Sequence, residues 1–265
     1  MRLCTIFLFV LAALAWAEGE ETKDKEKADK APKKTAAEIE IADPGVKIED
    51  ASSARREVTR FLKAFKESKK NEFKCAELVT TMLGKWDHAL VLKEAKKLVK
   101  HSSHIVAVQA VIVCARQTTG KSKIGGFLLK SLKKERRNHV RCALLVGMGA
   151  LGYDKTAAKK EAYSFFRRDT KETHKAATRY LGLIKDKEAF RLLAEKLDEP
   201  RSKAVNSPTN PPASYWRERW HEWNTNKKWT KWAIAQLVEG ETFDSTAEAK
   251  DWAKTAEARK HGIKW

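Results

Sequence analysis

A fixed step of 35 residues separates three similar segments of this chain. Each segment opens with a polar residue and a histidine and continues as an apolar run; the opening pairs are Ser103-His104, Asn138-His139 and Thr173-His174. The apolar columns keep the same phase: Ala107, Cys142 and Ala177 align, as do Val111, Val146 and Leu181, Ala110, Leu145 and Tyr180, and Val113, Met148 and Leu183. A constant period of this length is typical of stacked helical repeats, so we expect the three segments to lie side by side.

The chain before these segments has the spacing of a helical hairpin. In residues 51–67 an apolar stripe recurs at helical spacing, made of Val58, Phe61, Leu62 and Phe65. Residues 72–83 repeat that spacing with Phe73, Ala76, Val79 and Met82. Gly84 is expected to end the second helix in a left-handed conformation. The two stripes predict two helices that pack against each other.

The alternation of an amphipathic helix with a strongly apolar one continues along the chain. Asp87 is expected to cap the next amphipathic helix, and Ser103 to cap the apolar helix that follows. The further predicted helices span residues 104–115, 121–136, 138–151, 156–168, 173–185 and 187–197, the last of which opens a fifth pair. The sequence thus predicts an all-α fold, an α-solenoid of about five helical hairpins over residues 51–199.

Residues 200–265 depart from this regular phase. A proline-rich stretch at 207–212 cannot continue a helix. The two helices expected after it carry one aromatic stripe each: Trp216, Trp220 and Trp223 before Asn226, and Trp229, Trp232, Ile234 and Leu237 after it. We predict a proline-rich insertion, the last repeat helix and a tryptophan-rich helical C-terminal cap. The tryptophans fit either a packed cap or a platform that stacks sugars or bases.

The first 50 residues have a different character. Residues 1–17 combine a positive start, an apolar stretch from Leu3 to Ala15 and small residues at positions 15 and 17, the pattern of a signal peptide cleaved after Ala17. The apolar stretch is shorter than the roughly 18 to 20 residues of a membrane-spanning helix. Residues 18–50 are highly charged and poor in large apolar side chains, which predicts a flexible tether. We therefore predict an exported protein, periplasmic or secreted, with no transmembrane segment in the mature chain.

The end of the repeat region carries a family resemblance. Residues 176–184 read Ala-Ala-x-x-Tyr-Leu-Gly-Leu-Ile, and Asp186, Ala189, Leu193, Leu197 and Pro200 follow. Together with a second match at 140–152, these residues resemble the HEAT repeat, and residues 240–252 resemble the final cap of HEAT-like proteins exported by certain bacteria. The resemblance implies a right-handed curved array used as a binding surface or scaffold. The step of 35 residues is shorter than the roughly 40 to 47 residues of HEAT repeats.

The net charge of +19 is concentrated in the repeats, where residues 51–199 hold 34 Lys and Arg against 16 Asp and Glu. Six of these cations crowd one amphipathic helix and the turn after it: Lys130, Lys133, Lys134, Arg136, Arg137 and Arg141. Such a cluster can bind phosphates, sulfates or carboxylates. An ordinary solvated helix face explains the same residues. The six residues are the candidate anion-binding site.

No catalytic or metal-binding pattern stands out in the sequence. Gly120-Lys121-Ser122 lacks the first glycine of a phosphate-binding loop, because position 115 is alanine. The histidines of the three segments are expected roughly 8 to 10 Å apart on packed helices, too far for one shared zinc ion. After cleavage the chain keeps Cys75, Cys114 and Cys142, an odd number at no metal-ligand spacing, for which we expect packing roles. We therefore expect no catalytic residue, cofactor or metal.

These observations predict a noncatalytic binding or scaffold module of the cell envelope, whose partner is a protein or an anionic polymer. Nucleic acid is not the expected partner. The alternative from another class is an enzyme resembling the HEAT-like alkylpurine DNA glycosylases, which also combine basic helices with tryptophans. The export signal argues against this alternative, because genomic DNA lies on the other side of the membrane. The sequence leaves the oligomeric state open.

Overall fold

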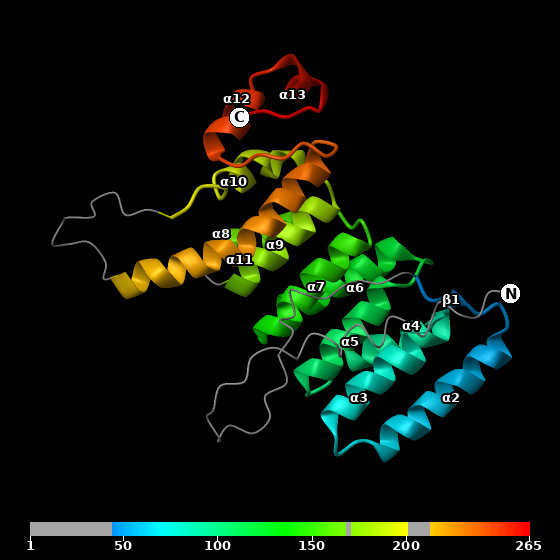
Figure 1. The fold of residues 1–265 in the computed structure, drawn as a ribbon. Helices are drawn as coiled ribbons and strands as arrows, with labels where there is room; N and C mark the ends of the chain where they lie inside the picture. Colours follow the sequence, from blue (N-terminus) through cyan, green and yellow to red (C-terminus); the bar gives the residue numbers. More distant parts are fainter. Residues whose placement is uncertain (1–43, 168–170, 201–212) are drawn as a thin grey trace, which may run out of the picture. The chain divides into compact units, whose positions relative to one another are not determined.

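Helices make up most of the part of the chain that the structure describes (Figure 1). The structure is a computed structural model, and it describes residues 44–167, 171–200 and 213–265. The predicted signal peptide, the tether up to residue 43 and the proline-rich stretch at 207–212 lie outside the described residues. All described residues belong to one compact unit, Lys34–Trp265. The prediction of a helical fold is confirmed.

The elements follow one another in this order along the chain. The α-helices are α2 (Ala51–Glu67), α3 (Glu72–Leu78), α4 (Ala89–Leu98), α5 (His104–Ala115), α6 (Lys121–Lys134), α7 (Asn138–Ala150), α8 (Thr156–Arg167), α9 (Lys171–Leu183), α10 (Phe190–Ala194), α11 (Ala213–Leu237), α12 (Thr246–Trp252) and α13 (Ala256–Lys260). A π-helical turn, η2 (Val79–Leu83), continues α3, and a 3-10 turn, η3 (Lys187–Ala189), precedes α10. A short parallel pair joins β1 (Val46–Lys47) to β2 (Trp86–Asp87).

The three helices that share the 35-residue period, α5, α7 and α9, form the centre of the core. The middle helix α7 packs against both α5 and α9, and α9 packs in turn against α11. The aligned apolar columns lie in these contacts: Cys142, Leu145 and Val146 of α7 are fully buried, as are Ala177 and Leu181 of α9. The expectation that the three repeated segments lie side by side is confirmed.

Glycine on both sides of α7 permits this close packing. A Cβ atom added at Gly147 would lie 3.0 Å from Cγ1 of Val111 in α5. One added at Gly149 would lie 3.0 Å from Cδ1 of Leu183 in α9. Because these separations are shorter than an ordinary van der Waals contact, larger residues at either position would push the neighbouring helices away.

Each central helix packs against the amphipathic helix that precedes it. The pairs are α4 with α5, α6 with α7 and α8 with α9, and α2 packs against α3, η2 and α4. In α6 the buried stripe is Ile124, Leu128 and Leu132, which recur at helical spacing. The lysines of α6 occupy the opposite side. Helical pairing of successive segments therefore agrees with the alternation seen in the sequence.

The first helix pair, α2 with α3 and η2, differs from the prediction at three positions. Phe73 is 70% exposed and Leu62 is 46% exposed, so neither belongs to the buried stripe to which the sequence assigned it. The expected left-handed stop at Gly84 is wrong, because Gly84 has a right-handed φ of −64°. Its N–H donates to the Val79 carbonyl at 2.8 Å and closes the π turn. A Cβ atom there would lie 2.5 Å from the Thr80 carbonyl oxygen, which explains the glycine.

The predicted cap of α4 is also wrong. Asp87 directs its carboxylate away from the helix and accepts the backbone N–H of Thr118 at 3.1 Å and the hydroxyl of the same residue. His88 is the N-cap residue of α4 instead, and its Nδ1 accepts the N–H of Leu90 at 3.1 Å. The Asp87 carboxylate thus accepts hydrogen bonds from Thr118, which is distant in the sequence, and does not cap α4.

The polar residues that open the three repeated segments do not form a recurring cap. Ser103 is the N-cap residue of α5, but its side chain makes no capping hydrogen bond. The N-cap residue of α7 is Arg137, and Thr173 lies inside the first turn of α9. The recurring apolar columns, rather than a shared cap, keep the central helices in register.

The C-terminal region contains one long helix where the sequence predicted two. Asn226 lies in the middle of α11, and the second half of that helix buries Ala233, Ile234 and Leu237. Trp252 packs with Phe190 and Phe243, at ring-centroid distances of 5.7 and 5.3 Å. Trp220 in the first half of α11 is 38% exposed, so the tryptophans divide between packed and solvent-facing positions. None of the described helices is both long and apolar enough to cross a membrane.

Candidate anion-binding surface

The exposed side of α6 carries lysine and no acidic residue. Lys130, Lys133 and Lys134 recur at spacings of three and four residues, which places them on one side of the helix, and all three are exposed. The buried stripe of α6 faces α7, so the lysines face solvent. In the described part of the chain, no ion pair or hydrogen bond is recorded for these three ammonium groups. Their charge is therefore available to a ligand.

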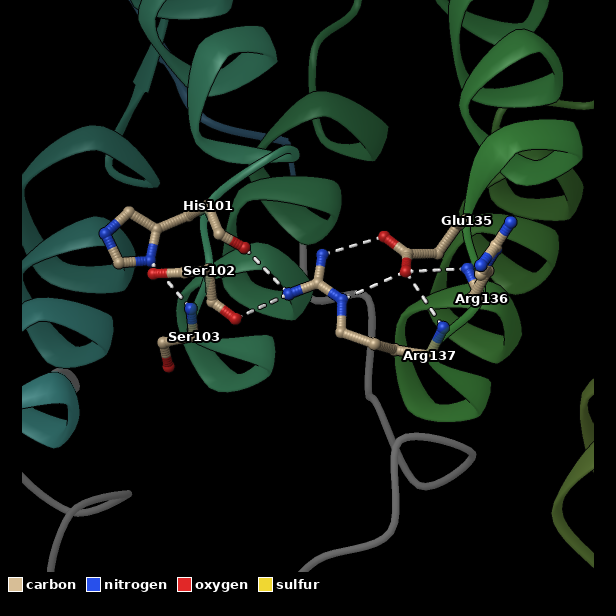
Figure 2. A network of polar contacts seen from close by, with 6 residues as sticks. All are labelled: His101, Ser102, Ser103, Glu135, Arg136 and Arg137. Atoms are coloured by element: carbon tan, nitrogen blue, oxygen red, sulfur yellow. Dashed lines mark hydrogen bonds and ion pairs between the residues drawn. The ribbon is translucent and has the colours of Figure 1, made fainter.

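The turn after α6 separates two arginines with different surroundings. Arg136 is exposed, and its side chain continues the row of lysines into solvent. Arg137 points the other way, toward the turn between α4 and α5 (Figure 2). Its Nη1 donates to the backbone carbonyls of His101 and Ser102 at 2.7 and 2.8 Å. Arg137 therefore joins two turns that lie 35 residues apart.

Glu135 neutralises Arg137 from the same turn. Its carboxylate accepts Nε of Arg137 at 2.9 Å and Nη2 at 2.7 Å, and it also accepts the backbone N–H groups of Arg136 and Arg137 at 2.9 Å (Figure 2). The hydrogen bond from the Arg137 side chain is the main reason that the pKa of Glu135 falls to about 2. The pair also raises the pKa of Arg137. Most of the charge of Arg137 is thus balanced within the protein.

Arg141, the last member of the predicted cluster, lies one turn into α7. Its guanidinium carbon is 4.6 Å from the ring centroid of Phe165 in α8, a cation–π contact, and the side chain is half-buried. The structure thus places Lys130, Lys133, Lys134 and Arg136 on one exposed surface. It places Arg137 and Arg141 in contacts between helices and turns.

The exposed cations continue onto α4, which the sequence analysis did not include in the site. Nζ of Lys96 lies 5.3 Å from the ring centroid of Phe127, so the outer sides of α4 and α6 adjoin. Lys93 is exposed on α4, Lys100 is exposed in the turn directly after it, and Lys97 is paired with Glu94 at 2.7 Å. The spacing of Lys93, Lys96, Lys97 and Lys100 at three, four and seven residues was the signal for this extension. We call Lys93, Lys100, Lys130, Lys133, Lys134 and Arg136 the basic surface.

The recurring histidines lie closer together than expected. The rings of His104 and His139 are stacked with centroids 5.5 Å apart, so the expected spacing of 8 to 10 Å is wrong for the rings of this pair. Nδ1 of His139 lies 3.4 Å from a carboxylate oxygen of Glu172, and the ring of His174 lies 4.2 Å from that of Phe166. Among the described residues, no group of three or more potential metal ligands occurs.

The cysteines occupy the core. Cys75, Cys114 and Cys142 are buried and unpaired. Burial raises the pKa of Cys75, and it raises the pKa of Cys114 and of Cys142 to about 12. Each thiol therefore stays protonated and packs as a small apolar group, in agreement with the packing roles predicted for them.

Comparisons with known proteins found no match to a family model, to a curated protein or to a solved structure.

Proposed function

We propose that this protein is a noncatalytic binding module that holds an anionic polymer on its basic surface. The observation that most directly supports this proposal is that α6 presents three aligned, exposed lysines and has no acidic residue. Arg136 extends this surface along the turn after α6, and Lys93 and Lys100 extend it onto α4 and the turn that follows α4. Several cations held at fixed positions bind a chain of phosphates or sulfates better than they bind a single small anion, because each contact releases counterions from the polymer.

The wider setting of the proposal is an exported, right-handed HEAT-like α-solenoid in the cell envelope. The contiguous packing of α5, α7, α9 and α11 supports a stacked array, and the N-terminal sequence supports export. In such an array the amphipathic helices face solvent and offer an extended surface for ligands. A protein partner with an acidic face would use the same cations. The anionic polymer is favoured because the basic surface lacks the large apolar side chains that anchor protein interfaces.

The test is binding of inorganic polyphosphate to the purified full chain, measured by fluorescence anisotropy at several salt concentrations. The triple variant K130E/K133E/K134E is expected to bind about a hundredfold more weakly than the wild type at low salt, because three attractive contacts become repulsive. Wild-type affinity is expected to fall steeply between about 50 and 200 mM salt.

The matched control is R217E/R259E/K264E. It makes the same change in net charge at exposed positions outside the basic surface. This variant is expected to keep most of the wild-type affinity, since only the long-range attraction is reduced. Equal losses in the two triple variants, or binding that does not change with salt, would show that the basic surface is not the binding site.

A further inference from the structure

A cavity separate from the basic surface lies among α8, α9, α10 and α11. Its volume is about 580 Å³, within the range of roughly 300 to 1,000 Å³ that is common for small-molecule pockets. Phe166 and His174 line it from α8 and α9, Leu192 from α10, and Trp223, Asn226 and Thr230 from α11. None of the residues of the basic surface contributes to its wall.

The charges around this cavity are mixed, in contrast to the basic surface. Glu195, Asp198, Glu199 and Glu222 line it, together with an equal number of Lys and Arg side chains. Three of these carboxylates have partners within the protein. Glu195 accepts Nε of Arg191 at 2.9 Å, Asp198 accepts the backbone N–H of Thr246 at 3.0 Å, and a carboxylate oxygen of Glu222 lies 3.9 Å from Nη1 of Arg219. Because the cations and carboxylates of the wall are equal in number, the wall has no net formal charge, and the cavity favours an uncharged ligand.

Asn226 supplies a buried polar group with an unused acceptor. The residue is 7% exposed and lines the cavity, and its Oδ1 has no hydrogen-bond partner among the described residues. The neighbouring hydroxyl of Thr230 does not satisfy it, since that hydroxyl donates to the backbone carbonyl of Asn226 at 3.3 Å. A buried acceptor without a partner is costly, so a ligand that donates a hydroxyl or N–H group would be stabilised here.

Trp223 gives the cavity a fixed aromatic wall. Its Nε1 donates to the Leu197 carbonyl at 3.2 Å, which holds the indole in place, and Nζ of Lys227 lies 4.6 Å from the ring centroid. Trp220 stands next to it, with ring centroids 6.3 Å apart, and is partly exposed to solvent. An aromatic face packs well against the C–H face of a ring whose edge carries polar groups.

We propose that this cavity binds a short, uncharged carbohydrate. Asn226 accepts a hydrogen bond from a sugar hydroxyl, Trp223 packs against the apolar face of a sugar ring, and the carboxylate of Glu199 accepts a further hydroxyl group. The site is independent of the basic surface. A failure of sugar binding in the cavity therefore does not contradict binding of an anionic polymer on the basic surface, and the reverse also holds.

The test uses the purified full chain with maltose, cellobiose and N,N′-diacetylchitobiose as probes, in saturation-transfer NMR followed by calorimetric titration. At least one of the three disaccharides is expected to bind with a dissociation constant of about 1 mM or below. Asn226→Ala is expected to weaken that binding about tenfold, the effect of one lost hydrogen bond. Asn226→Leu, which keeps the number and branching of the side-chain heavy atoms and removes the acceptor, is expected to do the same.

Asn224→Ala is the matched control, because Asn224 lies two residues away on α11, is exposed and does not line the cavity. It is expected to bind the sugar as the wild type does. Asn226→Ala is also expected to unfold at the same temperature as the wild type or higher, since it removes a buried polar group without a partner. Lack of binding by all three disaccharides, equal binding by Asn226→Ala and the wild type, or Asn226-dependent binding of glycylglycine in place of the sugars would overturn the proposal.

Discussion

Two neighbouring helices of similar length, α6 and α7, have opposite surroundings. Every residue of α7 from Cys142 to Gly149 is buried, because the helix lies between α5 and α9. α6 buries one stripe against α7 and exposes Lys130, Lys133 and Lys134. The comparison indicates that stability and ligand binding reside in different helices of one pair. Substitutions should therefore separate the two properties.

Leu145→Ala in α7 is expected to have the largest effect on stability. Leu145 is fully buried in the contact layer between the central helices, and removing its side chain should cost about 2 to 5 kcal/mol of the free energy of unfolding. Urea denaturation measures this loss. Polyphosphate binding by the folded fraction should not change. Leu62→Ala in α2 is the control, since Leu62 is exposed; a similar loss in both variants would contradict the contrast between central and outer helices.

Arg137→Ala is expected to have an intermediate effect. It removes the donors to the carbonyls of His101 and Ser102 and leaves Glu135 without its main partner, which should cost about 1 to 2 kcal/mol in the free energy of unfolding. Arg136→Ala, the adjacent exposed arginine, should leave stability unchanged and weaken polyphosphate binding instead. If the two variants exchanged these effects, Arg137 would be the ligand-binding member of the turn.

The smallest expected effect is on the pH dependence of stability. The pKa of Glu135 is about 2 in the folded protein against an ordinary value of 4.5, so the folded state holds the ionised form more strongly than the unfolded state does. This contribution is complete above pH 4.5 and is lost as the pH falls toward 2. Glu135→Gln should therefore show a shallower loss of stability than the wild type over that interval, in denaturation curves measured at each pH. Parallel pH profiles would show that the interaction of Glu135 with Arg137 does not stabilise the fold.

The periodic part of the sequence predicted the central helices well. Four aligned columns of apolar residues could only be buried if the three segments lay together, and Cys142, Leu145 and Val146 do lie in such contacts. The sequence analysis did not use Gly147 and Gly149 of α7. The structure explains them, because the close approach of α7 to α5 and α9 requires small residues at these positions. That the helix pairs form a right-handed α-solenoid stays a prediction, which depends on the HEAT resemblance.

Features that depend on long-range polar contacts were beyond sequence reasoning. In the sequence Asp87 has the position of a helix cap, but in the structure its carboxylate accepts a hydrogen bond from Thr118, 31 residues later. Arg136 and Arg137 are indistinguishable in the sequence, although one faces solvent and the other joins two turns. The lysines of α4 were predictable from their spacing, whereas their position beside α6 depends on how the helix pairs pack. The cavity beside Asn226 follows from the packing of four helices and had no signal in the sequence.

The burial of Cys75, Cys114 and Cys142 has a consequence for the chemistry of the proposed compartment. Outside the reducing cytosol, an exposed unpaired cysteine readily forms disulfides with other molecules, since oxidation proceeds through the accessible thiolate. In the part of the chain that the structure covers, all three cysteines are buried, and burial raises the pKa of each thiol, so that each keeps its proton. Oxidants would reach these thiols only when the helices that bury them separate, so the folded protein can tolerate an oxidising environment without a disulfide among these three cysteines.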